Sequence, residues 1–259
     1  MKRFARWSLL STRKSQNTRI VLSDVDGTLL KGSLVLDHAC TLHNKGIINL
    51  GDLPRSWISD PKNEHKIKEL AQSYQKEIIG KTLEDMNVAE FINDLFNDET
   101  RFYSTINRIR AFLREGYSVH LISGSPTYLL DSFAERINRD FLSNVSSSPN
   151  VRNTNVRSSV EIPSEVKVIK VVGSTYHMTN GKFNGKVDLM FTSKAKAEYV
   201  ALLNLSKQQK QKQRAEVIAF GDTSSDIPLF EAATYRVLVD PTTETEERLK
   251  DSIDEIVRI

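Results

Sequence analysis

Three short apolar runs in this chain each end abruptly in a polar cluster. RIVL precedes the cluster SDVDGT (residues 23–28), SVHLI precedes SGSP (123–126), and VIAF precedes GDTSSD (221–226). Short runs rich in β-branched residues are typical of buried strands in a parallel sheet. Because parallel strands end at one edge, where open α/β sheets bind ligands, we expect the three clusters to converge there.

The rest of the pattern predicts an α/β fold. Residues 106–116, 127–137, 194–205, 226–233 and 244–253 have helical spacing, and they alternate with expected strands at 117–123, 167–174, 215–222 and 235–240. Such alternation predicts a Rossmann-like three-layer core with a mostly parallel sheet. Asn180-Gly181 and Asn184-Gly185 are turn signals, and they predict a β-hairpin over residues 177–187.

Residues 33–102 differ, because their apolar residues have helical spacing and no buried strand is evident. We therefore predict a helical cap at 33–102 and a core formed by 19–32 and 103–259. A basic leader, 1–18, precedes the core as a solvated tail or an amphipathic targeting segment. The Ser- and Asn-rich stretch 143–159 is expected to be a mobile loop. The basic stretch 206–214 is typical of a solvated helix end.

Composition excludes some classes of protein. The 259 residues carry a net charge of only +3, which gives little support for nucleic-acid binding beyond the two basic stretches. The single cysteine, Cys40, excludes a disulfide within the chain and favours a cytoplasmic location. No apolar run approaches the roughly 18 residues that a membrane span needs.

Asp24 and Asp26 are the strongest candidates for chemistry. If the strand stayed extended, both carboxylates would point the same way, and Gly27 would permit a sharp turn. Two close carboxylates repel unless a cation lies between them, and oxygen ligands suit Mg²⁺. One could attack phosphorus while the other handles the leaving-group proton. Taken alone, the pair also fits an ordinary turn.

The other clusters supply partners for that chemistry. Ser123, Gly124 and Ser125 could bind an anion, or simply cap a helix that has Pro126 in its first turn. Asp222 could complete a metal shell, with Asp226 as a supporting or capping residue.

Two lysines, Lys194 and Lys196, begin the next expected helix, where one could contact a phosphoryl group. Any single lysine is more commonly a solvated surface residue. The order of the clusters and their placement after strands make the joint reading stronger than any part.

The motifs closely resemble the haloacid dehalogenase-like phosphatase superfamily. Its pattern appears in order as Asp24-Val25-Asp26-Gly27-Thr28, Ser123, Lys194 or Lys196, and Gly221-Asp222 with Asp226. The first motif followed by a helical insert, together with SGSP and the hairpin, resembles the phosphoserine-phosphatase-like branch. The resemblance implies an α/β core and a Mg²⁺-dependent phosphatase.

The resemblance also implies a role for each residue. Asp24 would be the nucleophile that forms an aspartyl-phosphate, and Asp26 the general acid and then base. Ser123, Gly124 and Ser125 would contact the phosphoryl oxygens, Thr28 would steady the loop, and Lys196, or else Lys194, would bind the phosphoryl group. Mg²⁺ would be held by Asp24, the Asp26 carbonyl and Asp222, with Asp226 in support. The branch usually has Gly-x-Gly-Lys or a similar pattern at this position, whereas this chain has Ser-Lys-Ala-Lys at residues 193–196. The choice between Lys194 and Lys196 therefore stays open.

Several functions share these motifs. The first is hydrolysis of a small phosphomonoester resembling phosphoserine. The alternatives are phosphotransfer to an alcohol through the same intermediate, a non-catalytic binding protein, and a nucleic-acid-directed role for the basic stretches. Substrate choice is expected to reside in the cap, where His38, His43, Arg55 and Lys81 are polar candidates. The pattern fixes neither the substrate nor the oligomeric state.

Overall fold

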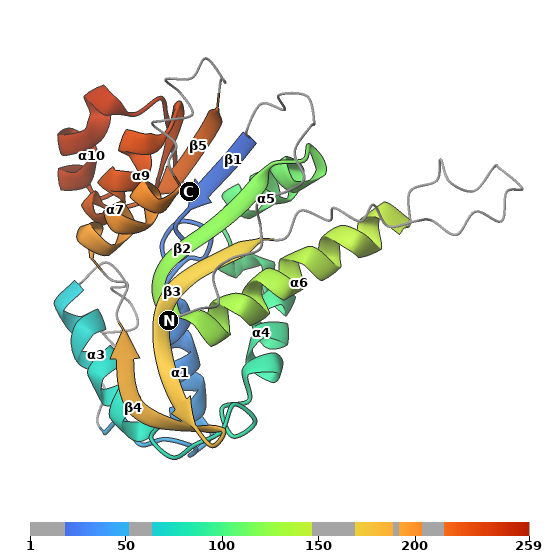
Figure 1. Cartoon of the computed structure of the whole chain (residues 1–259), viewed down its shortest axis with the longest axis vertical. Coiled ribbons are helices and arrows are strands. Elements are labelled where there is room, and N and C mark those ends of the chain that lie inside the picture. The colour runs from blue at the N-terminus through green and yellow to red at the C-terminus, as the bar shows by residue number, and fades with distance from the viewer. Residues whose placement is uncertain (1–18, 52–63, 147–168, 189–191, 204–214, 259) are drawn as a thin grey trace, which may run out of the picture.

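The computed structural model describes residues 19–51, 64–146, 169–188, 192–203 and 215–258. Seven strands form one sheet in the order β4-β3-β2-β1-β5-β6-β7, with β1 in the middle (Figure 1). The strands are β1 (Arg19–Ser23), β2 (Ser118–Pro126), β3 (Lys170–Thr179), β4 (Lys182–Asp188), β5 (Glu216–Gly221), β6 (Tyr235–Val239) and β7 (Glu255–Val257). The predicted leader, the basic stretch 206–214 and residues 147–159 of the predicted loop lie outside the described residues.

The sheet is parallel except for its β4 edge. β1 pairs in parallel with β2 and β5, and β4 pairs antiparallel with β3. A tight turn joins β3 to β4 at Asn180 and Gly181, whose φ angles of 52° and 76° suit the type I′ hairpin turn. The predicted hairpin is therefore confirmed. The second signal, Asn184-Gly185, lies within β4, opposite a register shift, and does not reverse the chain.

Two apolar layers sandwich the sheet. Alternate residues of β1 face opposite ways, so Val21 joins one buried cluster while Ile20 and Leu22 join the other. The first cluster includes α5 (Thr105–Arg114) and α6 (Thr127–Ser146); the second includes residues of α7 (Ser193–Leu202) and α9 (Ile227–Ala232). A short helix, η3 (Ser224–Asp226), precedes α9, and α10 (Thr243–Leu249) and η4 (Lys250–Ser252) lie between β6 and β7. The three-layer α/β prediction is confirmed.

The described part of residues 33–102 is helical. It contains α1 (Leu34–Asn44), α3 (Glu64–Glu77), α4 (Val88–Asn97) and η1 (Glu99–Arg101). In the lower half of Figure 1, α3 lies next to β4. Its two links to the core pair with each other, because Lys31 N–H donates to the Arg101 carbonyl at 2.7 Å and Tyr103 N–H to the Leu29 carbonyl at 3.0 Å. The division into cap and core stays a prediction.

The hairpin also contacts the insert. Gly80 N–H donates to the Phe183 carbonyl at 2.8 Å, and Phe183 N–H donates to the Lys81 carbonyl at 3.0 Å. The rings of Tyr74, Tyr128 and Phe183 cluster with Tyr176 where insert, hairpin and α6 meet. The insert thus contacts both the hairpin and α6.

The predicted start of the helix at Thr127 is confirmed, but the preceding strand runs to Pro126 instead of ending at Ser123. Pro126 therefore lies in β2, and the alternative that placed it in the first turn of a helix was wrong. α6 runs to Ser146, which places the first residues of the predicted 143–159 loop in a helix. β7 was not predicted at all. Among the described helices, none has the length and apolarity required to cross a membrane.

Candidate active site

The three polar clusters do converge at the carboxyl edge of the sheet. Asp24 follows β1, Ser123 lies near the end of β2, and Asp222 follows β5. Because β2, β1 and β5 are adjacent and parallel, their ends lie together. All three side chains are buried, with relative exposures of 5%, 0% and 5% respectively. Buried polar groups at this edge require partners, and the structure supplies them.

Lys196 joins the first and third clusters. Its Nζ lies 2.9 Å from Oδ1 of Asp24 and 2.6 Å from Oδ1 of Asp226. The lysine sits in the first turn of α7, which packs next to α9 and η3. Thr192 caps that helix by accepting a hydrogen bond from Ala195 N–H at 3.2 Å. Of the two candidate lysines, Lys196 is therefore the one that contacts the clusters. The side chain of Lys194 is 86% exposed and lies near Glu198, away from the group.

Asp226 is oriented from both sides. While its Oδ1 accepts from Lys196, its Oδ2 accepts the N–H groups of Asp222 and Thr223, each at 3.1 Å. Thr223 in turn completes a capping box with Asp226 at η3. Asp226 is therefore both a helix cap and a partner of the lysine.

Asp222 approaches the first cluster closely. Thr28 Oγ1 donates to Asp222 Oδ1 at 3.3 Å, and the Thr28 carbonyl accepts a hydrogen bond from Thr105. Gly27 has φ of +77°, and a Cβ there would lie 2.1 Å from Asp222 Oδ2. Glycine is thus required at 27 both for its backbone conformation and for the space beside Asp222.

Asp26 makes a different set of contacts from Asp24. Its Oδ2 accepts hydrogen bonds from Ser123 at 2.6 Å and Ser125 at 2.8 Å, and its Oδ1 accepts the Leu34 N–H at 2.6 Å. Asp24 instead contacts Lys196, so the two carboxylates have different hydrogen-bonding partners. The expectation that both point the same way applied to an extended backbone, and the strand itself ends at Ser23.

Burial dominates the electrostatics of the pair. It raises the pKa of Asp24 to about 8, with Lys196 opposing the rise and the charges of Asp226 and Asp26 adding to it. Burial alone would lower the pKa of Lys196, but the charges of Asp226 and Asp24 outweigh it and raise that pKa above its ordinary value. Lys196 is therefore charged at neutral pH.

The carboxylates fit a divalent cation. Asp24, Asp222 and Asp226 each offer a buried oxygen, and these atoms all lie within 4.8 Å of one another. The three carboxyl groups share one lysine charge, and a metal ion among them would favour the ionised form of Asp24, whose pKa burial raises. All-oxygen ligands match Mg²⁺. The Asp26 carboxylate is not a member of this group, so Asp26 could contribute only through its main chain.

The structure adds residues that the motif reading did not single out. Ser174 on β3 is fully buried, and its Oγ donates to the Gly124 carbonyl at 2.6 Å, which fixes the SGSP segment. Asp240 follows β6 at the same edge and accepts from the Tyr103 hydroxyl at 3.2 Å, with φ of +38°. Both follow or end an apolar strand run, the same signal that identified the other clusters.

Most of the chain matches a known protein family. Residues 72–257, more than half of the chain, match the family model of haloacid dehalogenase-like hydrolases. The chain belongs to this family. The matched range begins after Asp24, but β1 pairs with β2 and β5 inside that range, so the first cluster of this hydrolase belongs to the same sheet. No match was found among curated proteins.

Solved structures of this hydrolase fold include several phosphatases. A protein of unknown function from Bordetella pertussis Tohama I has 15% identity and a TM-score of 0.61, covering 93% of this chain and 99% of that one. A substrate-bound phosphoserine phosphatase has 13% identity and a TM-score of 0.53, covering 93% of both chains. Cytosolic 5′-nucleotidase IIIB bound to cytidine has 14% identity and a TM-score of 0.52, covering 93% and 81%. At these identities the likeness concerns the fold.

Proposed function

We propose that this hydrolase is a Mg²⁺-dependent phosphatase that acts on a small phosphomonoester through an aspartyl-phosphate on Asp24. The observation that carries the proposal is the position of Lys196, whose buried ammonium contacts Asp24 and Asp226 at once. A cation beside the attacking carboxylate would hold a phosphoryl group against it. Mg²⁺ bound by Asp24, Asp222 and the Asp26 carbonyl, with Asp226 in support, would neutralise charge on that group.

The first step transfers the phosphoryl group to Asp24. A carboxylate oxygen of Asp24 attacks phosphorus, the new O–P bond forms, and the bond from phosphorus to the substrate oxygen breaks. Asp26, protonated for this step, gives its proton to the departing oxygen, so an alcohol leaves. Ser123 and Ser125, which hold Asp26 at 2.6 and 2.8 Å, fix the position from which that proton is delivered.

The second step hydrolyses the intermediate. Asp26, now a carboxylate, takes a proton from water while the water oxygen attacks phosphorus. The bond between phosphorus and Asp24 breaks, which releases inorganic phosphate and restores both carboxyl groups to their starting states. Lys196 contacts Asp24 in the free protein and would balance the charge of the phosphorylated residue.

The substrate class follows from the family's fold relatives as a proposal. The names of the similar structures point to phosphoserine and to nucleotides. Both are small phosphomonoesters, and we place the phosphoserine-like metabolite first. The insert contacts the hairpin and α6, and a cap packed in this way would favour small substrates.

The proposal is tested by phosphate release from p-nitrophenyl phosphate, O-phosphoserine and cytidine monophosphate, with and without MgCl₂. We expect Mg²⁺-dependent turnover that EDTA abolishes and excess Mg²⁺ restores. Glu247→Gln, an exposed change on α10, is the matched control and should match the wild type. Turnover that is unaffected by EDTA would contradict the metal requirement. Products formed with ethanol as an added acceptor distinguish hydrolysis from phosphotransfer.

A further inference from the structure

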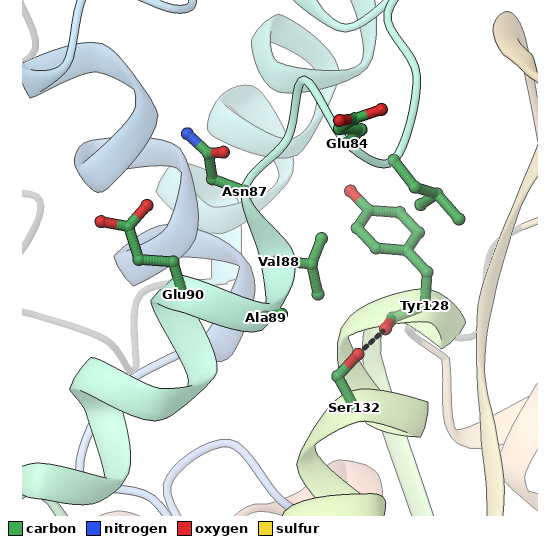
Figure 2. A pocket seen from close by; sticks show the side chains of 8 residues that line it. Glu84, Asn87, Val88, Ala89, Glu90, Tyr128 and Ser132 are labelled. Carbon is green, nitrogen blue, oxygen red and sulfur yellow. Dashed lines mark hydrogen bonds between the residues drawn. The ribbon is translucent and has the colours of Figure 1, made fainter.

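A cavity whose lining includes none of the clustered carboxylates lies between the insert and α6. Its volume is about 480 Å³, within the range of small-molecule sites. Figure 2 shows it between the start of α4 and the first turns of α6. The lining residues are Leu83, Glu84, Asn87, Val88, Ala89, Glu90, Tyr128 and Ser132. None of these residues belongs to the candidate active site.

A chain of hydrogen bonds fixes what Tyr128 can offer to this cavity. His38 Nε2 lies 2.7 Å from the Met86 carbonyl, which can only accept, so Nε2 carries the proton. Burial lowers the pKa of His38 to about 4, so the ring is neutral and its Nδ1 must accept. Nδ1 lies 2.8 Å from the Tyr74 hydroxyl, which therefore donates to it.

The hydrogen bond between Tyr74 and Tyr128 continues this chain to the wall of the cavity. Because the Tyr74 hydroxyl has given its proton to His38, its oxygen accepts from Tyr128, whose hydroxyl is its hydrogen-bonding partner. The Tyr128 proton is thus committed, and its oxygen retains only acceptor capacity. In Figure 2 the hydroxyl end of Tyr128 points toward the side of the cavity where Glu84 lies. A partner at this wall must bring a hydrogen-bond donor.

The charges of the lining agree with that requirement. Two carboxylates, Glu84 and Glu90, line the cavity, and no lysine or arginine does. Glu90 is paired with Lys45 at 2.9 Å, whereas within the described parts of the chain no ion pair joins Glu84 to a basic side chain. Leu83, Val88 and the Tyr128 ring supply apolar surface beside these acceptors. An aromatic ring next to a carboxylate also favours a cation.

We propose that this cavity binds a small organic cation, a primary ammonium group on an apolar body of a few carbons. The ammonium would donate to the Tyr128 oxygen and the Glu84 carboxylate, while the apolar part packs against Val88 and Leu83. Because the insert contributes Glu84 and α6 contributes Tyr128, a bound amine connects the two. α6 begins directly after Ser125 and Pro126, so the amine would also contact the helix that follows the candidate catalytic loop.

The test uses phenethylamine as the probe, with 2-phenylethanol and 3-phenylpropionate as neutral and anionic analogues, measured by isothermal titration calorimetry. We expect saturable binding of the amine with a Kd on the order of 1 mM. We expect at least about fivefold weaker binding of the alcohol and no binding of the acid. Glu84→Gln and Tyr128→Phe should each weaken amine binding by about fivefold, since each removes one acceptor.

Two controls make the result specific. Glu247→Gln, an exposed change outside the cavity, should bind the amine like the wild type. Asp24→Asn should also bind it normally, so the cavity is tested independently of catalysis. Thermal unfolding checks that each variant is folded. If Tyr128→Phe does not fold, the Glu84→Gln variant still tests the proposal, because Glu84 is exposed and its replacement should not disturb the fold. Absence of saturable binding, equal affinity for the alcohol, or an unaffected Glu84→Gln variant would overturn the proposal.

Discussion

The ammonium of Lys196 lies 2.9 Å from Oδ1 of Asp24, and both side chains are almost completely buried. A buried ion pair of this kind costs desolvation energy, which the attraction of its partners only offsets while every member is present. The stability of the fold therefore depends on keeping Lys196 and Asp24 together. The proposed function of the pair is to hold a phosphoryl group.

Removing this lysine should damage both stability and activity. Lys196→Met leaves the buried Asp24 and Asp226 carboxylates without their cation, so we expect a loss of about 3–5 kcal/mol in the free energy of unfolding. Urea unfolding measures the loss, and phosphate release should fall to background. Lys194→Met is the matched change two residues away. Its side chain is 86% exposed, so stability should change by less than about 0.5 kcal/mol and turnover should persist.

Adding one methyl group at Gly27 should displace Asp222. Gly27→Ala places a Cβ at a position 2.1 Å from Asp222 Oδ2 and at φ of +77°. We expect a destabilisation of about 1–3 kcal/mol and loss of Mg²⁺-dependent turnover. Gly46→Ala is the control, because its φ is +68° and nothing lies within 4 Å. Gly46→Ala should lose stability only through the strained backbone conformation and should retain activity. Equal turnover in the two variants would count against a role for the close approach of Gly27 to Asp222.

Acidification should destabilise the fold through His38. Its pKa is lowered to about 4 by burial, against about 6.5 in an unfolded chain, so the unfolded state binds more protons between these values. The stability associated with neutral His38 is fully present above pH about 6.5 and is lost as the pH falls through about 4. The same direction holds for His120, whose pKa burial also lowers to about 4.

The measurement is urea unfolding at several pH values for the wild type and His38→Gln. Carboxyl groups titrate in the same range, but they contribute to both proteins, and the difference between the two curves isolates His38. We expect that difference to change by on the order of 2–3 kcal/mol from pH 7 to pH 4. A difference that does not vary with pH would show that His38 titrates normally in the folded protein.

The sequence predicted the sheet edge well because local patterns determine it. Apolar strand runs that end in polar clusters were enough to place Asp24, Ser123 and Asp222 together, and the turn residues Asn180 and Gly181 were enough to predict the hairpin. These features depend on neighbours in the chain. The choice between Lys194 and Lys196 did not, since both begin the same helix and only the packing of α7 against η3 decides which one faces inward.

Other features also depended on tertiary contacts. The Asp26 carboxylate accepts hydrogen bonds from Ser123 and Ser125 of another strand, and the spacing of two aspartates does not encode these partners. β7 is a three-residue edge strand whose run is too short to show a period. The cavity between the insert and α6 is lined by residues of both segments. The residue pattern of either segment alone could therefore not indicate it.

The central claim is that Asp24 carries the phosphoryl group, and mass spectrometry of acid-quenched protein tests it most directly. The variant of choice is Asp26→Asn, mixed with p-nitrophenyl phosphate and MgCl₂. The p-nitrophenolate of this substrate can leave without a proton from Asp26, so the intermediate still forms in the variant. Hydrolysis of the intermediate lacks its general base, so the intermediate should accumulate. We predict a phosphoryl adduct on the peptide that contains Asp24, absent in the Asp24→Asn variant. If the wild type turns over under these conditions but Asp26→Asn carries no adduct on Asp24, or carries it on another residue, the mechanism is contradicted.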